Sequence, residues 1–194
     1  MRGRRRVVAL DLPGFGSERR ARFTLDDAPA HVASRVEAVG RAHLIGHSLG
    51  GLVAARVAAR RPDLVDRLVL VAPAGALPQR SLPSHALQLA HALRHTSPQF
   101  ARLLFGDALR AGPRTLWRGA RDLLDDDVVP ELEQIHAPTL LVWGSHDPLV
   151  PPALGELFRA AIPNAELVLV DDARHVPMLE RPAEFATLVD EFLT

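Results

Sequence analysis

The chain has 194 residues, 23 Lys plus Arg against 23 Asp plus Glu, and 47% hydrophobic residues. This length suits one domain with a real core, and the composition excludes a disordered chain, a collagen-like chain and a coiled coil. The zero formal net charge argues against nucleic acid or an anionic membrane as the main partner. Because the chain has no Cys, disulfides, thiolate metal sites and Cys nucleophiles are also excluded.

An Arg-rich start precedes the first apolar run of the chain. Residues 1–6 resemble the basic region of a signal peptide, but the apolar run Val7–Leu10 ends at Asp11. A signal needs roughly seven to fifteen apolar residues, and a membrane helix needs about twenty. We therefore interpret the start as a solvated chain end beside a short strand, and we expect a soluble, cytoplasmic protein without membrane association.

Apolar runs alternate with helix-like segments along most of the chain. Short runs rich in Val, Leu and Ile predict buried strands at Val7–Leu10, His43–Ile45, Arg67–Val71, Thr139–Trp143 and Glu166–Val170. Apolar residues at helical spacing predict helices over residues 28–40, 49–60, 152–161 and 182–193. This alternation predicts an α/β protein with a parallel, open sheet covered on both faces.

Residues 77–136 interrupt the alternation. They contain Pro, Gly and amphipathic stretches such as Ser84–Arg94 and Arg114–Leu124, but no convincing strand. We predict a helical cap over 77–136 between the two parts of a core, 1–76 and 137–194. Most apolar residues of this insert are expected to attach the cap to the core, and some to line an apolar pocket; they are Leu87, Leu93, Phe100, Leu103, Leu104, Phe105, Leu116 and Trp117.

The strongest local motif is Gly46-His47-Ser48-Leu49-Gly50-Gly51, where a predicted strand ends and a predicted helix begins. A Ser on such a sharp turn has a strained backbone, and the residues two positions away must be small to avoid clashes. Gly51 allows the helix to pack close to the sheet. The motif therefore favours a nucleophilic Ser48 over a merely structural turn.

A Ser nucleophile needs a general base, and the base needs an orienting carboxylate. Asp147 follows the fourth predicted strand and His175 follows the fifth. Both therefore lie at carboxyl ends of strands, where open α/β sheets bind their ligands. The order Ser48, Asp147, His175 is also the chain order of enzymes with a nucleophile elbow. We predict that these three residues form a catalytic triad.

Together these motifs resemble the α/β-hydrolase superfamily, in its esterase, lipase and C–C hydrolase branch with a helical cap. The matching segments are Asp11–Ser17, Gly46–Gly51, Gly144-x-x-Asp147 with Pro151, and His175-x-Pro177-x-x-Glu180-x-Pro182. The resemblance implies a mostly parallel α/β-hydrolase sheet, no cofactor and no metal, and the Leu49 N–H as one oxyanion donor. Arg174 replaces a Gly that is frequent in this family, so the pocket wall beside His175 is expected to differ.

The family pattern begins before residue 7, so the resemblance implies an N-terminally truncated sheet that lacks strands one to three. The strand His43–Ile45 would then lose a neighbour or pair directly with Val7–Leu10. The second oxyanion donor, from the loop after the third strand, has no counterpart in this chain. Loss of one such donor typically costs about 10²–10³ in rate.

The sequence thus predicts a serine hydrolase that cleaves a small, fairly hydrophobic carboxylic ester through an acyl-enzyme. The same triad would also serve C–C bond hydrolysis, lactone opening, acyl transfer or perhydrolysis, and the truncation leaves open a weak or inactive chain. Enzymes with an Asp nucleophile are disfavoured because Ser48 occupies the elbow.

Other polar residues are interpreted as structural. His47 is expected to be a packing or pocket residue, His146 an exposed turn residue, and Asp125–Asp127 a solvated loop or helix end. His85, His91 and His95 lack the H-E-x-x-H arrangement and a third ligand at motif spacing. We therefore interpret them as ordinary histidines of the cap helices and predict no metal site.

Overall fold

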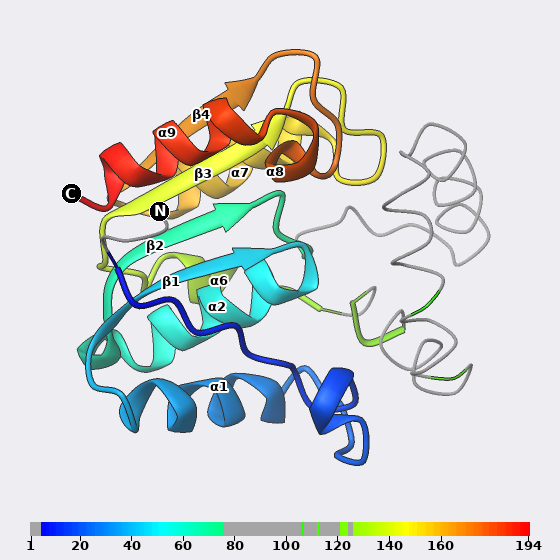
Figure 1. The fold of residues 1–194 in the computed structure, drawn as a ribbon, viewed down its shortest axis with the longest axis vertical. Helices are drawn as coiled ribbons and strands as arrows, with labels where there is room; N and C mark the ends of the chain where they lie inside the picture. The colour runs from blue at the N-terminus through cyan, green and yellow to red at the C-terminus, as the bar shows by residue number, and fades with distance from the viewer. Residues whose placement is uncertain (1–4, 76–105, 107–111, 113–120, 124–125) are drawn as a thin grey trace.

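A computed structural model describes residues 5–75, 106, 112, 121–123 and 126–194 of the chain (Figure 1). Its α-helices are α1 (Asp27–Glu37), α2 (Leu49–Arg60), α6 (Val129–Leu132), α7 (Pro152–Ala161), α8 (Pro177–Glu180) and α9 (Pro182–Phe192). Its strands are β1 (Ala42–His47), β2 (Val65–Val71), β3 (Thr139–Gly144) and β4 (Ala165–Val170). Short 3₁₀ helices, η1 (Gly16–Glu18) and η2 (Pro62–Leu64), complete the described elements.

The four described strands form one parallel sheet in the order β1-β2-β3-β4. The open parallel α/β sheet predicted from the sequence is therefore confirmed. Parallel neighbours need crossover connections, and in the described chain α2 joins β1 to β2 while α7 joins β3 to β4. All strands consequently end at the same edge of the sheet, and this edge carries the residues predicted to be catalytic.

Alternate side chains of the central strands enter two separate cores, as the two-residue period of a strand requires. Leu68 and Leu70 of β2 pack into a large core with α1, α2 and α7. Val69 and Val71 of the same strand pack into a smaller core with α9. In Figure 1, α1 and α2 lie near β1, whereas α9 lies near β3 and β4. Because β2 and β3 are covered on both faces, their carboxyl ends form a rigid base for the site.

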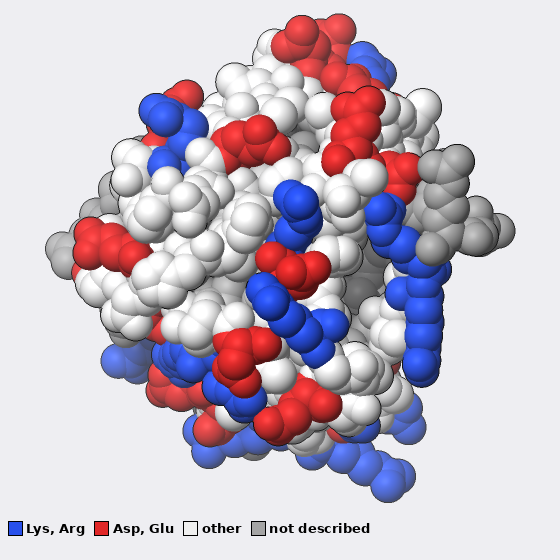
Figure 2. All heavy atoms as spheres, turned by 90° about the vertical axis from the view of Figure 1, so that its left-hand side faces the viewer, with Lys and Arg blue, Asp and Glu red and all other residues white. Residues whose placement is uncertain are grey.

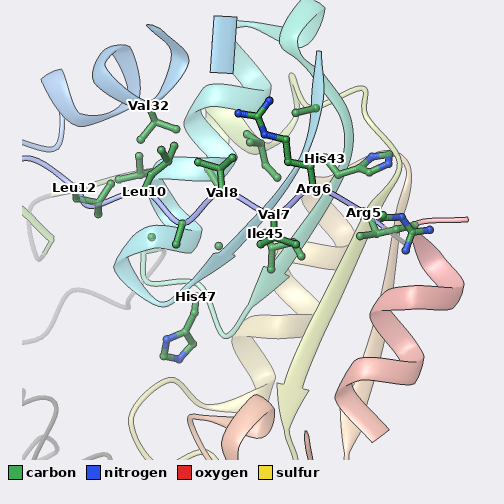
Figure 3. Close-up of a pocket in the computed structure, with 18 residues that line it drawn as sticks. Arg5, Arg6, Val7, Val8, Leu10, Leu12, Val32, His43, Ile45 and His47 are labelled. Carbon is green, nitrogen blue, oxygen red and sulfur yellow. The ribbon is translucent and has the colours of Figure 1, made fainter. Parts of the chain in front are cut away.

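The predicted strand at Val7–Leu10 is wrong. These residues form no strand and pair with no part of the described sheet, and Val7 is 72% exposed. They lie along one wall of a groove of about 820 Å³, and β1 supplies much of the opposite wall (Figure 3). Within the described residues β1 is thus an edge strand paired with β2 only. A run of four apolar residues favours extended backbone, but it does not specify a pairing partner.

Most of the predicted cap lies outside the described residues, including His85, His91, His95 and the apolar residues expected to line a pocket. The cap therefore stays a prediction. Within the described part of 77–136, α6 packs against α2, and Leu132 and Ile135 are fully buried in the larger core.

The acidic run was expected to be solvated, but Asp126 does not fit this interpretation. Its carboxylate pairs with the guanidinium of Arg56, and Arg56 is only 4% exposed. Arg56 also donates from Nε to Glu131 Oε1 at 3.0 Å and from Nη1 to the Leu25 carbonyl oxygen at 3.3 Å. A buried cation requires such partners, so these contacts attach residues 126–131 to α2.

Acidic and basic side chains are interspersed on the face shown in Figure 2, in keeping with the balanced charge of the sequence. Arg5, near the N-terminus, pairs with Asp190 of α9. The described helices include none with the length and apolar character needed to cross a membrane.

Candidate active site

Ser48 lies between the end of β1 and the start of α2, on a strained turn. Its φ of 50° and ψ of −121° fall where residues other than Gly rarely occur, at a typical cost of about 1–3 kcal/mol. The turn is held because the Ser48 N–H donates to the Val71 carbonyl oxygen at 3.0 Å and the Ser48 carbonyl accepts from Ala74 at 2.9 Å. This is the strand-turn-helix geometry expected of a nucleophile elbow.

Gly46 and Gly51 make the turn possible, as the motif predicted for these two positions. The expectation that Gly50 must also be small is wrong, because a Cβ there would meet nothing within 4 Å. A Cβ on Gly46 would lie 2.4 Å from the Gly50 carbonyl oxygen, and one on Gly51 would lie 2.9 Å from the Cβ of Pro73. Both distances are shorter than real Cβ contacts, so larger residues would move α2 away from the strand ends.

Asp147 lies in the loop after β3, and its carboxylate is fully engaged. Oδ1 accepts from the backbone N–H of Leu149 at 2.8 Å and of Val150 at 3.0 Å. Oδ2 accepts from His175 Nδ1 at 2.8 Å. Asp147 is 4% exposed and His175 is 5% exposed. The predicted acid and the predicted base are therefore brought together as a buried, hydrogen-bonded pair.

The loops that carry these two residues are joined by their backbones. His146 N–H donates to the Ala173 carbonyl oxygen at 2.9 Å, and Ser145 N–H donates to the Val170 carbonyl oxygen at 3.0 Å. Gly144 permits this approach, since a Cβ there would lie 2.0 Å from the carbonyl oxygen of Arg174. Close packing of the loops fixes the distance between the carboxylate and the imidazole.

The Asp147 contact also fixes the tautomer of His175. A carboxylate only accepts, so Nδ1 of neutral His175 must carry the proton, and Nε2 therefore holds a lone pair. Such a nitrogen is ready to accept a proton from a hydroxyl group.

His47 connects the Ser48 turn to this pair. Its Nε2 lies 2.8 Å from the His175 carbonyl oxygen, and the two rings lie 4.7 Å apart between centroids, tilted by 50°. The packing role expected for His47 is confirmed, but the hydrogen bond was not predicted. No local signal could have revealed it, because the two residues are 128 positions apart in the sequence.

Leu49 and His146 are the remaining candidate residues near the site. Leu49 is the first residue of α2, so its N–H has no acceptor within its own helix and remains the candidate oxyanion donor. His146 is exposed, as predicted, and its Nδ1 lies 3.0 Å from Ser145 Oγ. The described residues contain no cluster of three His, Cys, Asp or Glu suited to a metal ion.

A parallel α/β sheet with a strained Ser turn and a buried Asp–His pair at the carboxyl ends of its strands defines the class of hydrolases with a nucleophile elbow. The sequence profile of the Alpha/beta hydrolase family matches residues 1–188, and the chain belongs to this family.

Three known proteins illustrate the similarity. The chain is 32% identical over 215 residues to the pimeloyl-[acyl-carrier protein] methyl ester esterase of Neisseria meningitidis, covering 96% of this chain and 68% of that protein. It resembles the crystal structure of NosK from Streptomyces actuosus with a TM-score of 0.76 and 31% identity, covering 98% and 86% of the two chains. The enol-lactonase from Burkholderia xenovorans has a TM-score of 0.78 and 25% identity, with 94% and 78% covered.

Proposed function

We propose that this chain is a carboxylic-ester hydrolase in which Ser48 is the nucleophile, His175 the general base and Asp147 the residue that orients His175. The observation that carries the proposal is the buried hydrogen bond between His175 Nδ1 and Asp147 Oδ2, at 2.8 Å. The strained Ser48 turn is linked to the backbone of the same histidine, because His47 donates to the His175 carbonyl oxygen.

The acylation step uses the lone pair on His175 Nε2. This nitrogen takes the proton of the Ser48 hydroxyl as Oγ attacks the ester carbonyl carbon, and the resulting imidazolium is stabilised by the Asp147 carboxylate. The carbonyl oxygen becomes an oxyanion that accepts from the Leu49 N–H. When the intermediate collapses, the C–O bond of the ester breaks, and His175 returns the proton to the departing alcohol.

Deacylation repeats these steps with water. His175 removes a proton from the water as its oxygen attacks the acyl-Ser48 carbon, and then gives a proton back to Ser48 Oγ as the acid leaves. The cycle consumes one ester and one water, and it requires neither a metal nor a cofactor.

The relatives support an ester of a small alcohol as the substrate. One relative is named a methyl ester esterase and is 32% identical to this chain. The likeness to an enol-lactonase favours lactone opening as the second candidate, since a lactone is a cyclic ester that the same attack would open. We place a small, fairly hydrophobic acyclic ester first.

The test is a comparison of rates across a substrate panel. Purified protein is assayed with p-nitrophenyl esters of increasing chain length, with simple methyl esters and with a γ-lactone. We expect turnover of a short ester that disappears in Ser48→Ala and persists in Ser34→Ala. Ser34 is a suitable control because its hydroxyl donates within α1, to the His31 carbonyl oxygen at 2.8 Å. Equal turnover by the wild type and Ser48→Ala would refute the proposal.

A further inference from the structure

His47 is the last residue of β1 and directly precedes Ser48. Its Nε2 lies 2.8 Å from the carbonyl oxygen of His175. Because a carbonyl oxygen only accepts hydrogen bonds, His47 Nε2 must carry a proton and act as the donor. Figure 3 shows His47 at one end of the groove between β1 and the N-terminal segment.

His47 is kept uncharged by its surroundings. Burial and, to a smaller extent, the neighbouring His175 lower the pKa of His47 from 6.5 to about 4, although the bond to the His175 carbonyl and the charge of Asp147 act in the opposite direction. His47 is therefore neutral near pH 7. It serves as a fixed donor and does not compete with His175 for a proton.

Three hydrogen bonds hold the segment around His175, each at a different chemical group. Its imidazole is bonded to Asp147, and its carbonyl oxygen is bonded to His47. The preceding N–H, on Arg174, donates to Glu180 Oε2 at 2.6 Å. Of these three partners, only His47 is adjacent in sequence to Ser48.

We propose that His47 is a positioning residue that sets the place of the His175 imidazole relative to Ser48; this inference rests on the proposed roles of Ser48 and His175. One rigid strand-to-helix turn then carries both the nucleophile and the anchor of its base. A displacement of the elbow moves both together, so the distance for proton transfer is preserved. Loss of alignment by about 1 Å can cost roughly 10²-fold in rate.

Two substitutions separate the hydrogen bond from the packing of the ring. His47→Phe keeps an aromatic ring beside His175 but removes the donor. His47→Gln loses the ring but carries an amide N–H at the same number of bonds from Cβ. His136→Phe, at an exposed position, controls for replacing a histidine in general.

We expect His47→Phe to lower kcat by about 10- to 100-fold with little change in KM, and His47→Gln to restore kcat to within a few-fold of the wild type. A structural role alone would lower the amount of folded enzyme and would not be rescued by an amide. Equal kcat in the wild type and His47→Phe, or equal losses in the Phe and Gln variants, would overturn the proposal.

A readout without turnover distinguishes failure of this inference from failure of the proposed function. Proton NMR follows the downfield resonance of the His175 Nδ1 proton, which is bonded to Asp147. We expect this resonance to broaden through faster exchange in His47→Phe and to stay sharp in His47→Gln and Ser48→Ala. An unchanged resonance in His47→Phe would refute positioning by His47. A wild type without Ser48-dependent turnover would instead refute the esterase function.

Discussion

The exchange of Asp147 for Asn is the sharpest single perturbation of the site. The carboxylate accepts three hydrogen bonds, two at Oδ1 from backbone N–H groups and one at Oδ2 from His175. In Asp147→Asn the amide oxygen still accepts both backbone bonds. The amide NH₂ then faces His175 and donates, so Nδ1 must give up its proton and Nε2 must carry it. His175 is held in the tautomer that cannot accept a proton from Ser48.

The two roles of the Asp147 carboxylate, in catalysis and in stability, can be separated by different substitutions. The wrong tautomer costs about 10⁴ in kcat, or roughly 5 kcal/mol at about 1.4 kcal/mol for each factor of ten. Asp147→Asn preserves the loop and should lower stability little. Asp147→Ala would leave the N–H groups of Leu149 and Val150 without their acceptor, at about 1–3 kcal/mol each.

The assay combines kcat on a p-nitrophenyl ester with urea unfolding of the same samples. Asp63→Asn is the matched control, because Asp63 is an exposed carboxylate paired with Arg61 at 2.7 Å. We expect full activity in this control and a loss of about 10⁴ in Asp147→Asn. An Asp147→Asn protein that is folded and within tenfold of the wild-type kcat would refute the tautomer argument.

Other changes act on the framework of the site. Gly144→Ala places a Cβ 2.0 Å from the Arg174 carbonyl oxygen, so the His175 loop must move; we expect lower kcat and a lower Tm, and an unchanged kcat would contradict this. Arg56→Met leaves the carboxylates of Asp126 and Glu131 without their buried partner. We expect the free energy of unfolding in urea to fall by about 3–5 kcal/mol. A fall below about 1 kcal/mol would show that this group of charged residues does not stabilise the fold. Burial lowers the pKa of His47 from 6.5 to about 4. Between these pH values the unfolded chain therefore binds more protons than the folded chain does. Stability consequently falls as the pH drops from 6.5 toward 4, and this group contributes at most about 1.4 kcal/mol per pH unit. Urea unfolding at several pH values should show a weaker dependence in His47→Gln, and an identical dependence would contradict this assignment.

The sequence allowed a good prediction of the sheet and of the Asp–His pair. In the predicted strand Arg67–Val71, residues Leu68–Val71 are apolar on both faces, and this pattern distinguishes a buried strand from a loop. The observed β2 is Val65–Val71. Asp147 and His175 follow successive strands, and parallel strands end at one edge, so the chain order was sufficient to predict their proximity.

What could not be predicted depends on contacts between distant segments. Val7–Leu10 has the composition of a strand, but only a neighbour in space can make it one. Asp126 belongs to an acidic run that favours solvent, and its bond to Arg56 joins residues 70 positions apart. The bond between His47 and the His175 carbonyl likewise involves a backbone oxygen, which leaves no signature in the sequence.

The nucleophilic role of Ser48 is tested most directly by covalent labelling. The wild-type protein is treated with a fluorophosphonate, and the modified peptide is identified by mass spectrometry. We expect one adduct, on Ser48, that forms in Asp63→Asn, forms far more slowly in Asp147→Asn and is absent in Ser48→Ala. A wild-type protein that remains unlabelled at Ser48, or a Ser48→Ala protein that is labelled as fast as the wild type, would contradict the account.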